Sequence, residues 1–299
     1  MGRVTTRRPV RRVTPQGDVR RPDTLAVEEP LEIRIGGASF VVTMRTPGDD
    51  IDLAHGFLLA EGIIGSRADV RLIRYCDGVD AEGENTYNVL DVTLAEAAAA
   101  GARSAPARSF LSTSACGVCG KAALDDVRKQ TLFPLDTPRG TEQYAASEAA
   151  EPAYCSVALL GSLPDKLRAE QRVFEATGGL HAAGLFTPDG ELLAVREDVG
   201  RHNAVDKVVG WAVREDRLPL SETVLVVSGR ASFELVQKAV MAGVPLLGAV
   251  SAPSSLAVDL AAEAGLTLVG FLRGETMNVY THEGRVRTSA PAPPPRRRR

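Results

Sequence analysis

Apolar residues recur along this chain in two different rhythms, and the change between them predicts two structural parts. In the first part, short alternating segments punctuated by glycine predict a small α+β unit. A β-hairpin is expected over Leu31–Ile35 and Ala38–Met44, because two glycines separate the two runs. A helix is expected next, with Asp49 or Asp50 as its N-cap. Further strands are expected at Val70–Tyr75 and Tyr87–Leu94.

The second part alternates strands with helices from about residue 162 onward. Its strands are continuous apolar runs, which is typical of a sheet covered on both faces. This βαβ order predicts right-handed crossovers and a mostly parallel sheet, so the fold class is α/β with an α+β N-terminal part. Helices are expected at Lys121–Gln130, 162–176, Asn203–Val213, Ser232–Met241 and Ser255–Ala264, and strands at Leu180–Phe186, Leu192–Val195, Thr223–Val227, Pro245–Val250 and Leu266–Leu272.

Charge divides the chain differently from hydrophobicity. The net charge of −3 conceals +6 in residues 1–21, +6 in residues 285–299 and −15 between them. Both basic ends are rich in Arg and contain Pro, so we expect them to be disordered tails. The expected domains are a basic tail at 1–21, a small α+β domain at 22–107, a C-x-x-C loop with a helix and connection at 108–152, an α/β domain at 153–284 and a Pro/Arg tail at 285–299.

Composition excludes several classes of protein. At 44% hydrophobic and 24% charged residues, the chain is neither fibrous nor wholly disordered. It has no apolar run of about 18 residues and no secretory signal, so we expect no membrane association and a cytoplasmic location. The acidic central part argues against a dedicated nucleic-acid binder, although the basic tails could contact an acidic partner.

The most distinctive local motif is Cys116-Gly-Val-Cys119, which precedes a predicted helix and lies near Lys121. A helix N-terminus and a nearby cation both favour the thiolate, which can hold sulfane sulfur as a persulfide. A thioredoxin-type site normally has its own βαβ context, which is missing here. A zinc site needs about four ligands, and no second C-x-x-C is present. Reactive sulfur chemistry is therefore the best of three interpretations, while Cys76 and Cys155 are expected to be buried small hydrophobic residues.

Four loops are expected to meet at the carboxyl ends of the predicted strands, where open α/β sheets bind ligands. They are rich in Gly, Ser, Arg and Asn, and three of them open a helix. Such loops suit a phosphorylated, nucleotide-sized ligand, although each alone is an ordinary cap or turn. His181 is interpreted as a core residue, and His202 as the better site candidate. The loops occupy residues 197–203, 228–232, 251–255 and 273–278.

Several long motifs resemble those of the formate dehydrogenase accessory sulfurtransferases, the FdhD family. They run in order from about Thr24 to His282 and leave out only the tails. The motifs are Ser-Thr-Ser-Ala-Cys116-Gly-Val-Cys119-Gly-Lys, Phe174-Glu-Ala-Thr-Gly-Gly-Leu-His181, Arg196-Glu-Asp-Val-Gly-Arg-His202-Asn, Val227-Ser-Gly-Arg230-Ala-Ser and Phe271-Leu-Arg273-Gly-Glu-Thr-Met-Asn278.

The resemblance implies a sulfur carrier that takes persulfide sulfur from a cysteine desulfurase. It would pass this sulfur to the molybdenum of the bis(molybdopterin guanine dinucleotide) cofactor, as formate dehydrogenase activity requires. It also implies a homodimer and a C-terminal part resembling the cytidine deaminase fold, but without zinc, because His181 is followed by Ala-Ala and Cys116 is preceded by Ala.

The resemblance assigns roles to particular residues. Cys116 would carry the persulfide with Cys119 in support, and GDP would be an analogue of half of the cofactor. An alternative function is a non-catalytic chaperone that only binds the cofactor and hands it over. The residues expected to bind the cofactor are Arg201, His202, Ser228, Gly229, Arg230, Phe271, Leu272, Arg273, Gly274, Glu275, Thr276 and Asn278.

Overall fold

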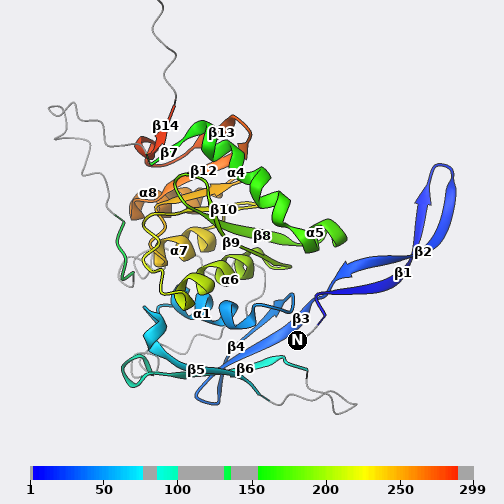
Figure 1. The fold of residues 1–299 in the computed structure, drawn as a ribbon, viewed down its shortest axis with the longest axis horizontal. Helices are drawn as coiled ribbons and strands as arrows, with labels where there is room; N and C mark the ends of the chain where they lie inside the picture. The colour runs from blue at the N-terminus through cyan, green and yellow to red at the C-terminus, as the bar shows by residue number, and fades with distance from the viewer. Residues whose placement is uncertain (1–2, 77–85, 100–130, 136–153, 289–299) are drawn as a thin grey trace, which may run out of the picture.

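The computed structural model describes residues 3–76, 86–99, 131–135 and 154–288 (Figure 1). The predicted 121–130 helix lies outside this part of the chain. The described chain forms a four-stranded sheet and a six-stranded sheet, and helices α1 and α6 lie between these two sheets. None of the helices in the described ranges has the length and apolar content needed to span a bilayer.

The N-terminal region corrects the expectation of a disordered basic tail. β1 (Thr5–Thr14) and β2 (Gly17–Ala26) form an antiparallel hairpin that projects from the body of the molecule (Figure 1). The strands pair without interruption, and the turn between them uses Gly17 at a φ of 132°. Thr and Val residues are interspersed with the arginines of both strands, and their β-branched side chains favour a strand despite the high Arg content.

The small sheet has the strand order β4-β3-β6-β5. The predicted hairpin is confirmed, because β3 pairs antiparallel with β4 across Gly36 and Gly37, both at positive φ. One face of the sheet packs against α1, and buried leucines from both elements join the main hydrophobic core. The elements are β3 (Glu29–Ile35), β4 (Ala38–Arg45), α1 (Asp50–Ala60), the 3₁₀ turn η1 (Arg67–Asp69), β5 (Val70–Tyr75) and β6 (Val89–Leu94).

The large sheet has the strand order β13-β12-β11-β10-β8-β9, and its α/β class is confirmed. Four strands run in one direction, but only the β10–β11 and β11–β12 pairs are parallel, so the sheet is mixed rather than mostly parallel. Hairpins at the two edges supply two of the antiparallel pairs, and β10 forms the third with β8 inside the sheet. The strands are β8 (His181–Phe186), β9 (Leu192–Asp198), β10 (Val224–Val227), β11 (Leu246–Ala249), β12 (Thr267–Arg273) and β13 (Thr276–Val279).

Helices cover both faces of this sheet, which explains why its central strands are apolar throughout. In β10, Leu225 and Val227 join the core under α6 to α8, while Val224 and Val226 join the core under α4. The predicted 162–176 helix is two helices, because Ser156 caps an earlier start and Gln171 interrupts the run. The helices are α4 (Val157–Glu170), α5 (Arg172–Thr177), α6 (Arg201–Arg214), α7 (Phe233–Met241) and α8 (Ser255–Ala264).

Two short elements complete the fold next to the β12–β13 edge (Figure 1). β7 (Cys155–Ser156) pairs in parallel with β14 (Val286–Arg287), and the 3₁₀ turn η2 (Glu283–Arg285) precedes β14. The expected C-terminal tail therefore begins with ordered structure at 285–288, while residues 289–299 lie outside the described part.

α1 and α6 pack backbone to backbone through two glycines. A Cβ added at Gly210 would overlap the carbonyl oxygen of Asp52, and one added at Gly56 would overlap that of Asp206. All four positions are buried. The close approach ties the small sheet to the large one, because α1 belongs to the first and α6 to the second.

We expect Gly210→Ala to lower the free energy of unfolding by about 1–3 kcal/mol, because the added methyl forces the two helices apart. Alanine in a helix interior normally stabilises by about 0.5–1 kcal/mol relative to glycine, so the sign of the change is diagnostic. Urea denaturation measures it. Gly284→Ala, where an added Cβ meets nothing within 4 Å, is the control. Equal or greater stability for the Gly210 variant would contradict the proposed contact.

Candidate functional site

A cavity of about 700 Å³ lies at the strand ends on the α4/α5 side of the large sheet. Loops following three neighbouring strands contribute to it: Ser228 after β10, Val250 after β11 and Arg273 at the end of β12. This is the crevice where open α/β sheets bind ligands. α4 and α5 form the opposite wall, which includes Arg168 and Phe174.

His181 opens β8 and lines the same cavity. Gly229 lies beside its ring, since a Cβ added there would be in van der Waals contact with the His181 Nδ1 at 3.4 Å. Burial lowers the pKa of His181, and the electrostatic effect of Arg201 and His202 lowers it further. The imidazole is therefore neutral at physiological pH, and one ring nitrogen is free to accept a proton or a hydrogen bond.

The turn after β12 is fixed by close backbone packing. The Gly274 carbonyl lies so near Gly161 of α4 that any side chain at position 161 would overlap it. Gly274 itself has a φ of 53°, in the left-handed region that glycine adopts most readily. The Thr276 Oγ1 donates a hydrogen bond to the Arg273 carbonyl oxygen at 3.0 Å and closes the turn. The exposed Arg273 side chain is thus carried at the cavity rim on a well-defined backbone.

The opposite wall offers a flat cationic surface. The Arg168 guanidinium lies over the Phe174 ring, 4.6 Å from its centroid. Phe174 is held in place because the Glu197 carboxylate accepts hydrogen bonds from the backbone N–H groups of Val173 and Phe174 at 2.9 and 2.7 Å. Stacked rings and guanidinium groups of this kind bind planar bases and anions.

A second polar cluster lies on the other side of the sheet, at the N-termini of α6 and α7. The His202 Nε2 lies 2.7 Å from a Glu234 carboxylate oxygen and 3.3 Å from the Ser232 Oγ. The hydrogen bond from His202 lowers the pKa of Glu234 against the opposing effect of burial. The two groups therefore form a charge-assisted pair near the strand-end loops.

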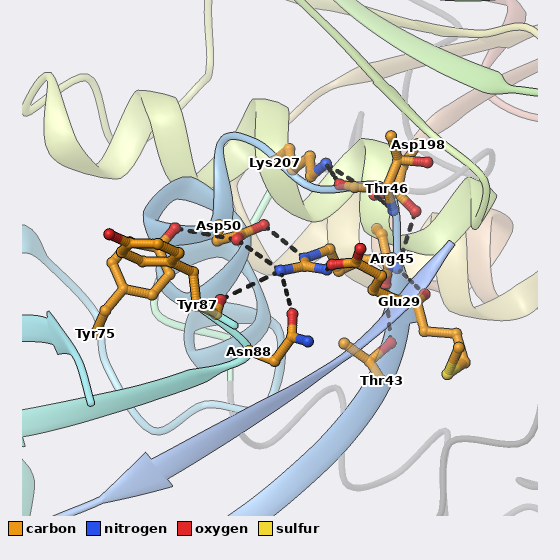
Figure 2. A network of polar contacts seen from close by, with 12 residues as sticks. Glu29, Thr43, Arg45, Thr46, Asp50, Tyr75, Tyr87, Asn88, Asp198 and Lys207 are labelled. Carbon is orange, nitrogen blue, oxygen red and sulfur yellow. Dashed lines mark hydrogen bonds and ion pairs between the residues drawn. The ribbon is translucent and has the colours of Figure 1, made fainter. Parts of the chain in front are cut away.

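Asp198 fixes the start of α6, the helix that Arg201 and His202 open. Figure 2 shows Asp198 beside Thr46 and Lys207. The Asp198 side chain is completely buried and forms an ion pair with Lys207 at 2.8 Å. It also accepts hydrogen bonds from the backbone N–H of Thr46 at 3.1 Å, the backbone N–H of Gly200 at 2.8 Å and the Asn203 amide at 3.0 Å. One carboxylate thus connects the end of β4, the end of β9 and the start of α6.

A neighbouring network secures the same end of β4 to α1 (Figure 2). The buried Arg45 guanidinium donates to both oxygens of Asp50, at 2.9 and 3.1 Å. It also reaches Asn88 Oδ1 at 3.0 Å, and Tyr75 donates to Asp50 from β5. Burial and the Asp50 carboxylate raise the pKa of Tyr75 well above its usual range, so the phenol remains a donor.

The structure brings together some of the predicted cofactor-binding residues and separates others. Ser228, Leu272, Arg273 and Gly274 line the cavity, where the Ser228 Oγ accepts a hydrogen bond from the Ala182 N–H at 2.9 Å. Arg201 and His202 act on His181 electrostatically but open α6 beyond the lining. Arg230 is exposed on the loop after β10, outside the lining.

The remaining predicted residues lie around a second hollow. A groove of about 860 Å³ is lined by Phe271, Glu275, Thr276 and Asn278, on the β13 and β14 side of the turn. Phe271 has a φ of 52° and is 43% exposed. The 271–276 segment therefore borders two hollows, with Arg273 facing the cavity and Phe271 lining the groove.

Both predicted catalytic residues, Cys116 and Cys119, lie outside the described residues. Within the described ranges, no group of three or more His, Cys, Asp or Glu side chains is placed to hold a metal ion. The expected absence of zinc stays a prediction.

Sequence reasoning missed part of the cavity. His181 was interpreted as a core residue, yet it lines the cavity together with Arg168 and Phe174. The sequence did carry one signal for this role. Gly178 and Gly179 lie just before β8, and glycines near a strand can mark a place where a ligand approaches the backbone closely. Arg168 carried no sequence signal, since its role depends on the fold of α4.

Comparison with known proteins gives a consistent result. A family model described as the FdhD/NarQ family matches residues 26–287. A Nocardia farcinica protein named "Sulfur carrier protein FdhD" is 65% identical over 289 residues, 96% of each chain. A Mycolicibacterium paratuberculosis protein of the same name is 59% identical, covering 95% of this chain and 99% of that one.

A solved structure supports the fold. The crystal structure of a protein described as a formate dehydrogenase accessory protein from Desulfotalea psychrophila superposes with a TM-score of 0.70. It covers 95% of this chain and 100% of its own, at 22% identity. At that identity the likeness concerns the fold alone.

We expect Cys155 to be nearly inert toward alkylation, because burial raises its pKa to about 11. Against an ordinary thiol of pKa 9.0, the thiolate fraction near pH 7 falls by about 100-fold. Mass spectrometry after timed iodoacetamide treatment measures the rate, and the half-buried Cys76 is the internal control. Both cysteines should react alike in urea. Equal native rates would contradict the assignment of Cys155 as a structural thiol.

Proposed function

The chain belongs to the FdhD/NarQ family, and from this premise we propose that it is a sulfur carrier acting in the maturation of a formate dehydrogenase. The observation that carries the proposal is the match to proteins named for sulfur carriage, at up to 65% identity over nearly the whole chain. We propose Cys116 as the sulfur-accepting thiolate and Cys119 as its supporting residue.

The proposed sulfur transfer proceeds in two steps. The Cys116 thiolate attacks the outer sulfur of a persulfide on a cysteine desulfurase, and the desulfurase cysteine leaves as a thiolate. Cys116 then holds the sulfane sulfur as a persulfide. In the second step the S–S bond of the persulfide breaks and its electron pair returns to Cys116 as the thiolate. The outer sulfur passes to the acceptor, which supplies the two electrons that reduce this sulfur to sulfide. On this proposal the chain is a sulfurtransferase acting in the cytoplasm.

We propose that the acceptor is the molybdenum of a bis(molybdopterin guanine dinucleotide) cofactor bound as substrate, which then enters the dehydrogenase. Arg273 at the cavity rim and the Arg168–Phe174 stack offer charge for a phosphate and a face for a base. The second hollow across the 271–276 turn suits a ligand with two nucleotide arms. GDP would occupy one hollow as an analogue.

Replacing Cys116 by Ser tests the chemistry. The variant should fold normally yet lose sulfur loading, because a hydroxyl cannot hold sulfane sulfur. Intact-mass analysis after incubation with a cysteine desulfurase and cysteine measures a gain of one sulfur that a reductant reverses. Cys76→Ser is the matched control and should load normally. Full loading of the Cys116 variant would refute the assignment, and GDP binding retained in it would show that recognition is separate from sulfur transfer.

Arg273→Ala should weaken GDP binding by about 10- to 100-fold if the guanidinium donates charged hydrogen bonds to phosphate. Isothermal titration calorimetry gives the dissociation constant. Arg71→Ala, which removes an exposed arginine on β5, should leave it unchanged. Unchanged affinity in the Arg273 variant would mean that the phosphates bind elsewhere.

A further inference from the structure

The groove of about 860 Å³ beside β13 lies where the described chain ends. β13 is the edge strand of the large sheet, so its outer edge has no strand partner among the described residues. Gly284 of η2 and Val286 of β14 also contribute to the lining. Thr288, the last described residue, lines the groove as well. The rest of the chain, residues 289–299, therefore starts at the groove.

The lining combines apolar and acidic side chains. Met277 and Val286 are half-buried, and the aromatic ring of Phe271 is 43% exposed. Glu275 and Glu283 are exposed, and the described lining contains no Lys or Arg. The groove thus offers an apolar surface with an aromatic ring together with two negative charges. Such a surface suits a segment that is apolar in one part and cationic in another.

Residues 289–299, the C-terminal segment, have this complementary composition. Their sequence is Ser-Ala-Pro-Ala-Pro-Pro-Pro-Arg-Arg-Arg-Arg. Proline-rich segments bind grooves that contain aromatic side chains at a low entropic cost, because proline fixes φ. In the polyproline II form, a segment of this length extends over about 34 Å, at about 3.1 Å per residue. It is therefore long enough to bring both its prolines and its arginines to a groove that begins at Thr288.

We infer that the C-terminal segment binds in this groove of its own chain, with the prolines on the apolar lining and the arginines near Glu275 and Glu283. The attachment at Thr288 gives the segment a local concentration on the order of millimolar, so weak contacts are sufficient to hold it. Proline carbonyl oxygens can also accept hydrogen bonds from outward N–H groups at the open edge of β13.

Occupation of the groove controls access to it. The groove borders the 271–276 turn and is the second hollow proposed above for the cofactor. A ligand could enter it only by displacing the C-terminal segment, so the free chain blocks its own groove. The inference rests on the groove and the C-terminal sequence, and it does not depend on the proposed sulfur chemistry.

A photocrosslink in the full-length chain tests the contact. A benzophenone amino acid replaces Ala292, and ¹⁵N-labelled and unlabelled chains are mixed before irradiation. We expect crosslinks to peptides that contain residues 271–279 or 283–288, within single chains. Crosslinks spread over the rest of the surface would overturn the inference. Crosslinks that join labelled to unlabelled chains would also overturn it, because the occupant would then be the segment of another copy.

Charge reversal tests the role of the arginines in the same experiment. Glu275→Lys with Glu283→Lys should lower the crosslinking yield at low salt by at least about threefold, because two attractive contacts become repulsive. The matched control is Glu28→Lys with Glu215→Lys, which makes the same charge change at exposed positions outside the groove. Circular dichroism checks that both variants fold. Equal yields in the groove variant and the control would overturn the inference.

A charge swap separates a direct contact from an effect of net charge. Replacing all four terminal arginines, residues 296–299, by Glu should lower the yield in the wild-type background. The same replacement should restore the yield in the Glu275→Lys, Glu283→Lys background, because opposite charges again face each other. Losses that simply add in the combined variant would contradict the pairing of these groups.

Hydrogen–deuterium exchange gives a readout without the crosslinker. In the wild-type chain the bound segment shields the open edge of β13, so replacing residues 296–299 by Glu should speed exchange in peptides covering residues 275–280 by at least about twofold. Peptides covering β5, at the edge of the small sheet, are the internal reference and should not change. Unchanged exchange along β13 would mean that the segment does not occupy the groove.

Discussion

The buried carboxylate of Asp198 is the interaction on which the geometry of the site depends. It has no exposed surface, and its charge is balanced by Lys207, which is itself 1% exposed. Removing one member of such a pair leaves an uncompensated buried charge and costs about 3–5 kcal/mol. The backbone N–H groups of Thr46 and Gly200 complete its coordination, so it joins the small sheet to the loop that opens α6. The loop position is therefore set by both sheets.

The glycine contact between α1 and α6 makes this arrangement possible. With Gly56 and Gly210 the two helix backbones touch, and the end of β4 comes near enough for Lys207 to donate to the Thr46 carbonyl oxygen at 2.8 Å. Larger residues would separate the helices and leave these polar groups buried without partners. The small N-terminal sheet thus acts as part of the site scaffold, although its strands contribute no residue to the lining of the cavity.

The sequence was informative where local pattern and burial agree. The apolar β10 strand and the β3–β4 hairpin were both predicted. A strand buried on both faces is apolar at every position, and the tight turn of the hairpin is marked by its two glycines. The β1–β2 hairpin was missed because its six arginines suggested disorder, although Thr and Val residues also occur along both strands. The mixed strand directions were missed because edge pairing is decided by tertiary contacts. His181 was misjudged for the same reason, since its exposure depends on α4 and α5.

The side chains that line the cavity keep the same charge near neutral pH, so the affinity for an anionic ligand bound there would not depend on pH in that range. His181 lines the cavity, but burial and the nearby cations lower its pKa, so it adds no positive charge there. Arg168 and Arg273 supply that charge, and arginine stays protonated at any physiological pH. An anionic ligand would therefore meet constant positive charge beside a neutral imidazole that can accept a proton. The proposed sulfur chemistry of Cys116 instead depends on a thiolate, whose population changes with pH. Under the proposed function, ligand binding and sulfur transfer should consequently respond differently to acidification.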